Sequence, residues 1–227
     1  MPSTDVTQAR SAYQSELEQL RLQVELMGVR VDENLERMRS VLHRGDEREA
    51  ALALAADDEI DAMQVSLTER CYELLAREQP VASDLRLVVS AVRITAELER
   101  IGDLALRVAK LAPDHALLHR YPEIFDVLAA LADLALDHYR LALRSFAGQS
   151  VGLAEEVSAG SPEVGHLTDR LVGEVHRLQG DDAVPVAVKV MSAGQSLSRI
   201  DDHATVLGAR LRYLFTGDPD HLAAEVR

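Results

Sequence analysis

Two carboxylates spaced four residues apart are the side chains of this chain whose type and spacing most favour chemistry. Glu99 and Asp103 lie in a segment with a helical pattern, and on a helix residues i and i+4 project from one face, one turn apart. Like charges at this spacing repel unless something offsets them. A bound cation is one candidate, and a solvated face paired with nearby arginines is the other. The pattern alone leaves both interpretations open.

The sequence around these carboxylates occurs twice. Residues 97–105 return as residues 196–204 at a constant offset of 99. Ser198 stands at the position of Glu99, so only the first copy keeps both carboxylates. The chain is therefore predicted to be a duplicated unit. The identical pairs are Leu98 and Leu197, Arg100 and Arg199, Ile101 and Ile200, Asp103 and Asp202, and Ala105 and Ala204.

A second register supports the duplication at a different offset. Residues 27–31 match residues 131–135, and residues 59–60 match residues 163–164, both at an offset of 104. Two helices at 104 and a third at 99 predict a connection about five residues shorter in the second copy. No flexible linker separates the halves, so we expect them to pack against each other.

Apolar residues recur at steps of three and four along six tracts, which predicts six long helices. Aromatic residues make up only 4% of the chain, and Trp is absent, as is typical of helical rather than half-buried strand sequences. Proline and glycine mark the ends of the tracts. The fifth tract is weakened by the Gly160-Ser161-Pro162 segment. The predicted helices cover residues 5–43, 46–77, 81–111, 122–147, 152–178 and 184–215.

Charge and composition exclude several classes of protein. The net charge of -14 and the pI near 5.0 argue against a protein that binds nucleic-acid phosphates, which requires clustered Lys and Arg. The single cysteine, Cys71, excludes an internal disulfide and is expected in the core. Residues 1–10 hold no apolar run after a basic segment, and no stretch of about 18 apolar residues follows. We therefore expect a soluble, cytoplasmic protein.

Catalytic motifs are not apparent in the sequence. It holds no Gly-x-Ser-x-Gly motif, no glycine-rich phosphate loop and no nucleophile with an evident base. The eight histidines lack the spacing of a zinc site. His115 and His119 are four apart but flank a predicted connection between Pro113 and Pro122. The sequence therefore favours a protein without enzyme activity, and a metal-dependent hydrolase would need paired His and Asp ligands that the chain lacks.

Three segments together resemble the PhoU family of phosphate-transport regulatory proteins. They are residues 79–86 (QPVASDLR), residues 99–103 (ERIGD), and residues 199–217, which run from RIDDHA to YLFTG. Their order and spacing, together with the repeat and the length, extend the resemblance over nearly the whole chain. The resemblance implies an all-α fold of two tandem three-helix bundles, residues 1–113 and residues 114–227, with six long antiparallel helices.

The resemblance also implies a function and partners. Family members act as cytoplasmic negative regulators of inorganic phosphate uptake and of phosphate-starvation signalling. They act by contact with the ATPase of a phosphate ABC transporter, with a sensor histidine kinase, or with both. The implied protein contacts the membrane only through these partners, binds no nucleic acid, and is a candidate homodimer. The alternative is a divalent-cation-binding bundle whose function is metal storage or sensing.

A metal site is implied in the first half. Several family members bind iron, zinc or other divalent cations through an E/D-x-x-x-D motif on the third helix, which corresponds here to Glu99 and Asp103. The second helix of the family adds carboxylates in an acidic segment that matches Asp57 and Asp61, again four apart. Four carboxylates would make an all-oxygen site that suits a cation such as Fe, Zn, Mg or Ca, among which the sequence does not distinguish.

The second copy departs from this pattern. Asp57, Asp61 and Glu99 correspond to Ser161, Gly165 and Ser198, which leaves Asp202 as the one retained carboxylate and a weak candidate ligand. Neighbouring donors offer partial substitutes, although Asp201 is rotated by about 100° from Asp202 on a helix and should point elsewhere. We therefore predict one cation site, in the first half. The partial substitutes are Asp201, His203 and Glu163.

Overall fold

The computed structural model describes residues 3–226, with side chains from residue 10 to residue 222, and this part of the chain is helical without strands. The predicted all-α class is confirmed. Met1, Pro2 and Arg227, at the ends of the two predicted bundles, lie outside the described residues. None of the described helices is long and apolar enough to cross a membrane. The elements are α1 (Ser3–Arg44), α2 (Glu47–Glu78), α3 (Ala82–Ala109), η1 (Ala112–Asp114), α4 (His115–Leu118), α5 (Pro122–Gly148), α6 (Val151–Ser158), α7 (Pro162–His176), α8 (Ala183–Thr216) and η2 (Pro219–Val226).

Local sequence signals mark the starts and ends of the helices at the predicted places. The Asp46 side chain accepts hydrogen bonds from the backbone N–H groups of Arg48 and Glu49 at 3.0 and 3.2 Å, which makes it the N-cap of α2. Gln79 ends α2 in a left-handed conformation, and Pro80 follows it. Pro122 opens α5 at a position where its missing N–H costs nothing.

The fifth predicted helix differs from the structure, because it is divided into α6 and α7. Gly160 has a φ of +72°, which ends the right-handed helix. Pro162 then begins α7, since it has no N–H to bond back to the preceding turn. The weak segment seen in the sequence is therefore a complete break, and α7 ends at His176 rather than at residue 178.

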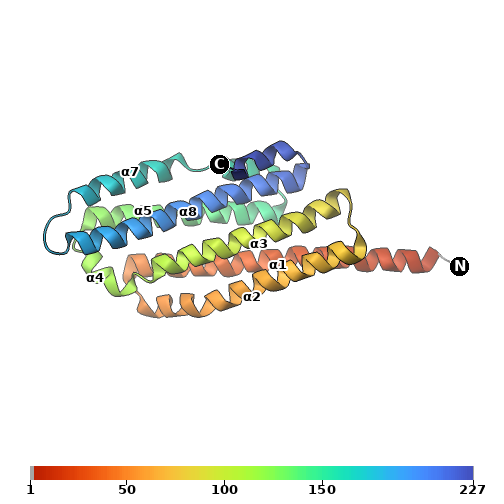
Figure 1. The fold of residues 1–227 in the computed structure, drawn as a ribbon, viewed down its shortest axis with the longest axis horizontal. Helices are drawn as coiled ribbons and strands as arrows, with labels where there is room; N and C mark the ends of the chain where they lie inside the picture. Colours follow the sequence, from red (N-terminus) through yellow and green to blue (C-terminus); the bar gives the residue numbers. More distant parts are fainter. Residues whose placement is uncertain (1–2, 227) are drawn as a thin grey trace.

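Four helices, α1, α3, α5 and α8, surround one continuous core. α2 packs against α1 and α3, while α6 and α7 pack against α5 and α8. Figure 1 shows α2 and α7 at opposite edges of the molecule, with α3 and α8 between them. One cluster of buried apolar side chains extends from Leu20 of α1 to Leu207 of α8, across both halves. The halves therefore pack against each other, and their division into two domains after residue 113 stays a prediction.

Equivalent hydrogen bonds confirm the register of the repeat. The Asn34 side chain donates to the Ala53 carbonyl at 3.5 Å, and His138 contacts the Val157 carbonyl at 3.0 Å. Both members of the second pair lie 104 positions after those of the first.

The offset of 104 continues beyond the break between α6 and α7. Leu67 and Leu171 are matched at this offset, and both are buried. The break between α6 and α7 therefore changes the direction of the chain without changing the register. The five-residue shortening falls after Leu171 and before the buried part of α8.

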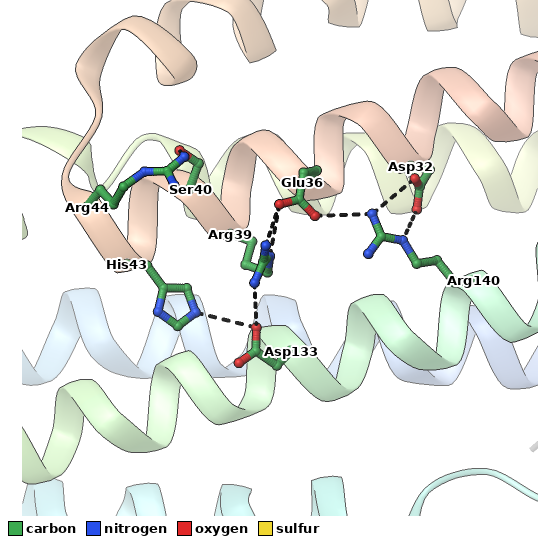
Figure 2. A network of polar contacts seen from close by, with 8 residues as sticks. All are labelled: Asp32, Glu36, Arg39, Ser40, His43, Arg44, Asp133 and Arg140. Atoms are coloured by element: carbon green, nitrogen blue, oxygen red, sulfur yellow. Dashed lines mark hydrogen bonds and ion pairs between the residues drawn. The ribbon is translucent and has the colours of Figure 1, made fainter.

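A chain of ion pairs joins α1 to α5 along the surface (Figure 2). Arg140 of α5 donates to Asp32 at 2.7 and 3.2 Å and to Glu36 at 3.1 Å. Arg39 pairs with Glu36 at 2.6 Å and with Asp133 at 3.7 Å. All five side chains are partly exposed, so water screens their interactions and each pair contributes little free energy. The network bridges the first helices of the two repeats, which pack against each other through the core.

Helices α8 and α6 approach each other closely at Gly208, and a substitution there tests this contact. A Cβ atom at this position would lie 2.5 Å from the Ser158 backbone nitrogen and 2.9 Å from the Val157 carbonyl carbon. Because backbone cannot give way as a side chain can, Gly208→Ala should lower the free energy of unfolding by about 1–3 kcal/mol. Chemical denaturation would measure it. Gly165→Ala in α7 is the matched control, since its Cβ meets nothing within 4 Å and helix propensity favours alanine by up to about 1 kcal/mol. Equal stabilities of the two variants would contradict the close packing.

Candidate functional site

The hairpin of α2 and α3 brings the four predicted carboxylates together. The two helices run antiparallel from the connection at residues 79–81, and the Ile60 side chain lies 3.5 Å from where a Cβ at Gly102 would be. Asp57 and Asp61 lie on either side of Ile60 along α2, and Glu99 and Asp103 lie on either side of Gly102 along α3. The residues that the sequence predicted as ligands thus occupy the same level of the hairpin.

The carboxylates repel one another across the two helices. Desolvation raises the pKa of Asp57, and the charges of Asp103 and Asp61 raise it further. Desolvation followed by the charge of Asp103 raises the pKa of Asp61. The pKa of Glu99 is raised by desolvation and then by Asp103, Asp61 and Asp57, against a smaller opposite effect of Arg100. Asp103 is the charge that all three neighbours share.

The donor set fits a hard or borderline cation by its chemistry. All four groups are carboxylates, which are the ligands that Mg²⁺, Ca²⁺ and iron accept. Among the side chains of residues 10–222, however, no group of three or more His, Cys, Asp or Glu residues is already arranged to hold a metal ion. The four groups share a level of the hairpin and a mutual repulsion that a cation would relieve. Cation binding at Asp57, Asp61, Glu99 and Asp103 stays a prediction.

The corresponding region of the second half has a different construction. Ser161 lies at the break before α7, and Gly165 adds no side chain to it. Asp202 is exposed on α8, with its pKa raised by desolvation and by the charge of Asp201. Glu163 is exposed in the first turn of α7. The weak assignment of Asp202 as a ligand likewise stays a prediction.

Asp201 points away from Asp202, as the helical rotation predicted. Its carboxylate is buried and accepts a hydrogen bond from His138 Nδ1 at 2.6 Å. The other ring nitrogen of His138, Nε2, contacts the Val157 carbonyl at 3.0 Å. Both partners are acceptors, so this geometry suits the protonated imidazole, in which both ring nitrogens donate. Burial lowers the pKa of His138, but the hydrogen bond and charge of Asp201 outweigh it, and the pKa is raised.

Sequence reasoning missed this buried pair, and it also missed the role of His203. His203 Nδ1 of α8 contacts Glu97 of α3 at 2.6 Å, with both side chains largely buried. The pair joins the two halves and is not directed at Asp202. A signal for His138 was present, because at an offset of 104 it occupies the position of the buried Asn34. The partners, Asp201 and Glu97, lie too far away in sequence to be found by local spacing.

The remaining histidine and cysteine candidates are structural. The rings of His115 and His119 are 4.3 Å apart in an edge-on arrangement, and His119 stacks on Phe125 at 4.1 Å. Burial, and then His119, lowers the pKa of His115. The Cys71 thiol is fully buried, and desolvation raises its pKa to about 11. Cys71 is therefore a core residue, as predicted.

The His138–Asp201 pair predicts a pH dependence of stability. Because the folded pKa of His138 lies above its unfolded value, its stabilising contribution is complete below about pH 6.5 and is lost as the pH rises through the folded pKa. Asp201 of α8 and Glu156 of α6 supply the negative charges that raise the pKa of His138.

Chemical denaturation at pH 6 and pH 9 would measure this dependence. Asp201→Asn should cost about 1.5–3 kcal/mol at pH 6 and less at pH 9. His176→Asn changes an exposed histidine of α7 and should leave the wild-type pH profile intact. A cost of Asp201→Asn that is the same at both pH values would contradict a protonated His138.

Comparison with known proteins places the chain among its relatives. Residues 24–112 match the model of the PhoU domain. The chain is 31% identical over 167 residues to a phosphate-specific transport system accessory protein PhoU homolog of Deinococcus radiodurans, covering 71% of this chain and 76% of that protein. It is 26% identical over 216 residues to the phosphate-specific transport system accessory protein PhoU of Serratia marcescens, covering 94% of this chain and 88% of that protein.

Solved structures agree with these matches. The crystal structure of PhoU from Pseudomonas aeruginosa superposes with a TM-score of 0.83 at 29% identity, covering 91% of this chain and 100% of that one. The phosphate transport system regulatory protein PhoU from Streptococcus pneumoniae shares the fold, with a TM-score of 0.78 at 24% identity over 91% of this chain and 98% of that one. The chain belongs to the PhoU family.

Proposed function

We propose that this chain is a cytoplasmic negative regulator of inorganic phosphate uptake and of phosphate-starvation signalling. The observation that supports this most strongly is the match over most of both chains to proteins named as accessory proteins of the phosphate-specific transport system. The proposed mechanism is docking to the ATPase of a phosphate ABC transporter, to a sensor histidine kinase, or to both. Self-association into a homodimer is a further part of the proposal.

The chemistry of the described side chains supports contact rather than turnover. Three side chains of types that often serve as nucleophiles or bases are buried or paired. Cys71 is buried with a pKa of about 11, so its thiol stays protonated. His138 is bound between Asp201 and the Val157 carbonyl. His203 is bound to Glu97. We therefore propose a regulator without enzyme activity.

Deleting the gene tests the regulatory function. In phosphate-rich medium, expression of phosphate-uptake genes should rise in the deletion strain and return to the wild-type level when the gene is restored. Quantitative transcript measurement would show it, and co-purification with the transporter ATPase and with the kinase, in separate experiments, would identify the partner. Unchanged expression after deletion would contradict the proposed function.

Cation binding is the second candidate function, and the mutual repulsion of Asp57, Asp61, Glu99 and Asp103 favours it. In this case the four carboxylates would hold a divalent or iron-type cation, whose charge would offset theirs. Metal storage or sensing would then be the primary role. The same site could also serve regulation by fixing the geometry of the hairpin.

Asp103→Asn tests the cation site with two opposite effects. With a chelator present, the free energy of unfolding of the variant should exceed that of the wild type by a few tenths of a kcal/mol. This is roughly the cost of a like-charge pair on a helix. With Fe²⁺, Zn²⁺, Mn²⁺ or Mg²⁺ added, the wild type should gain more stability than the variant. Asp126→Asn, which changes an exposed carboxylate on α5, should show neither effect. Protein purified without chelator that is metal-free, fully folded and unchanged by added metal would exclude this function.

A further inference from the structure

Four large apolar side chains of α2 and α3 are exposed in the half of the hairpin that lies nearest the connection. Val65 and Tyr72 of α2 are 54% and 59% exposed, and Leu85 and Val89 of α3 are each 40% exposed. We call these four residues the hairpin strip. Single exposed apolar residues are ordinary on a protein surface, whereas a contiguous set is typical of an interaction site.

The four residues are contiguous because of helix geometry. Val65 and Tyr72 are seven residues apart, and Leu85 and Val89 are four apart, so each pair lies on one face of its helix. The antiparallel hairpin sets Ile60 against Gly102. Tyr72 lies twelve residues after Ile60 on α2, and Val89 lies thirteen residues before Gly102 on α3. Because the two helices run in opposite directions, both steps lead to the same level of the hairpin. The two pairs therefore lie side by side across the hairpin.

The duplication repeats the exposed apolar face at the start of the third helix. At an offset of 99, Leu85 and Val89 correspond to Val184 and Val188 of α8, which are 73% and 65% exposed. Met191, the equivalent of Val92, is 37% exposed. Neither half buries this face against the rest of the protein. The same positions therefore remain apolar and exposed in two sequences that have otherwise diverged.

Acidic side chains continue the hairpin strip along the same two helices. From Val89 the face of α3 passes through Val92 and Ala96 to Glu99 and then Asp103, at steps of three and four. On α2, Asp61 lies four residues before Val65. These carboxylates lie at one level of the hairpin, beside the Ile60–Gly102 contact. The surface is thus apolar at the end near the connection and negatively charged in the middle of the hairpin.

The pattern of this surface specifies the chemistry of its partner. An amphipathic helix laid along a groove between two helices contacts it through side chains at i, i+3, i+4 and i+7. Apolar side chains would cover the hairpin strip, while Arg or Lys one or two turns away would reach the carboxylates. An anionic membrane is disfavoured, because the chain carries a net charge of -14 and like charges repel.

We propose that the hairpin strip, with the adjoining carboxylates, docks a basic amphipathic helix of a partner protein. This inference rests on the proposed function of regulation by contact and names the surface and the partner chemistry. The first half supplies both the apolar and the charged contacts. The second half keeps the apolar face of α8 but has Ser198 in place of Glu99. Only the first half therefore offers the set of carboxylates that favours a basic partner.

A synthetic peptide helix tests the surface directly. The probe is an 18-residue helix with Leu on one face and Lys on the other, and its counterpart replaces each Lys with Glu. Fluorescence anisotropy at low salt should show that the wild-type protein binds the Leu/Lys helix at least tenfold more tightly than the Leu/Glu helix. The double variant Leu85→Ser, Val89→Ser should bind the Leu/Lys helix at least tenfold more weakly, with an unchanged thermal melt, since both side chains are exposed.

Matched variants separate this surface from the general acidity of the protein. Leu22→Ser, Leu26→Ser removes two exposed leucines from α1, 54% and 48% exposed, and should change the affinity by less than twofold. Asp61→Asn, Glu99→Gln should weaken the Leu/Lys helix and not the Leu/Glu helix. Equal losses from the α1 and α3 variants, or no binding of the Leu/Lys helix by the wild type, would overturn the proposal.

Other occupants of the strip give different results. A wild-type dimer that dissociates in the Leu85→Ser, Val89→Ser variant, seen by analytical ultracentrifugation, would assign the strip to a second copy of the chain. Strip-dependent binding to phosphatidylcholine vesicles would assign it to a membrane. Either result would overturn the proposal. The peptide assay needs no phosphate machinery, so its failure leaves the gene-deletion test intact. A binding-deficient variant that still restores full repression would show that this surface carries no regulatory contact.

Discussion

The antiparallel packing of α3 against α8 is the constraint on which the rest of the structure depends. These are the third helices of the two repeats, and they meet face to face in one continuous core. The Glu97–His203 contact at 2.6 Å sets their alignment. Because both third helices bury their inner sides in this seam, α2 and the α6–α7 pair must pack on the outside. The outer faces of the third helices then remain available for ligands or partners.

This arrangement explains why the halves have diverged at equivalent places. In the first half, the Ile60 side chain lies against Gly102 of α3, and four carboxylates lie beside that contact. In the second half, Asp201 occupies the position of Gly102 and is neutralised by His138. The negative charge is therefore partly exposed and shared among neighbours in one half, and buried and paired in the other. The first half keeps the surface that can respond to a cation or a basic partner.

The sequence predicted much of the fold because helix periodicity and helix ends are local properties. Stripes at steps of three and four, with Asp46, Pro80 and Pro122 at the boundaries, were enough to place the long helices to within a few residues. The same locality explains the one clear difference. Gly160 and Pro162 were visible as a weak point, but whether a helix bends, continues or breaks there depends on what the two pieces pack against.

For the candidate site, the sequence by itself determined that Glu99 and Asp103, and also Asp57 and Asp61, share a helix face, because a separation of four residues fixes direction on any α-helix. Only the tertiary structure decided that the two pairs meet at one level of the hairpin, and that His138 finds Asp201 across 63 residues of sequence. It also decided which apolar residues stay uncovered. Leu98 and Leu85 are both leucines of α3, but Leu98 is buried in the core and Leu85 stays exposed. Contacts between distant segments are set by packing, which no local pattern encodes.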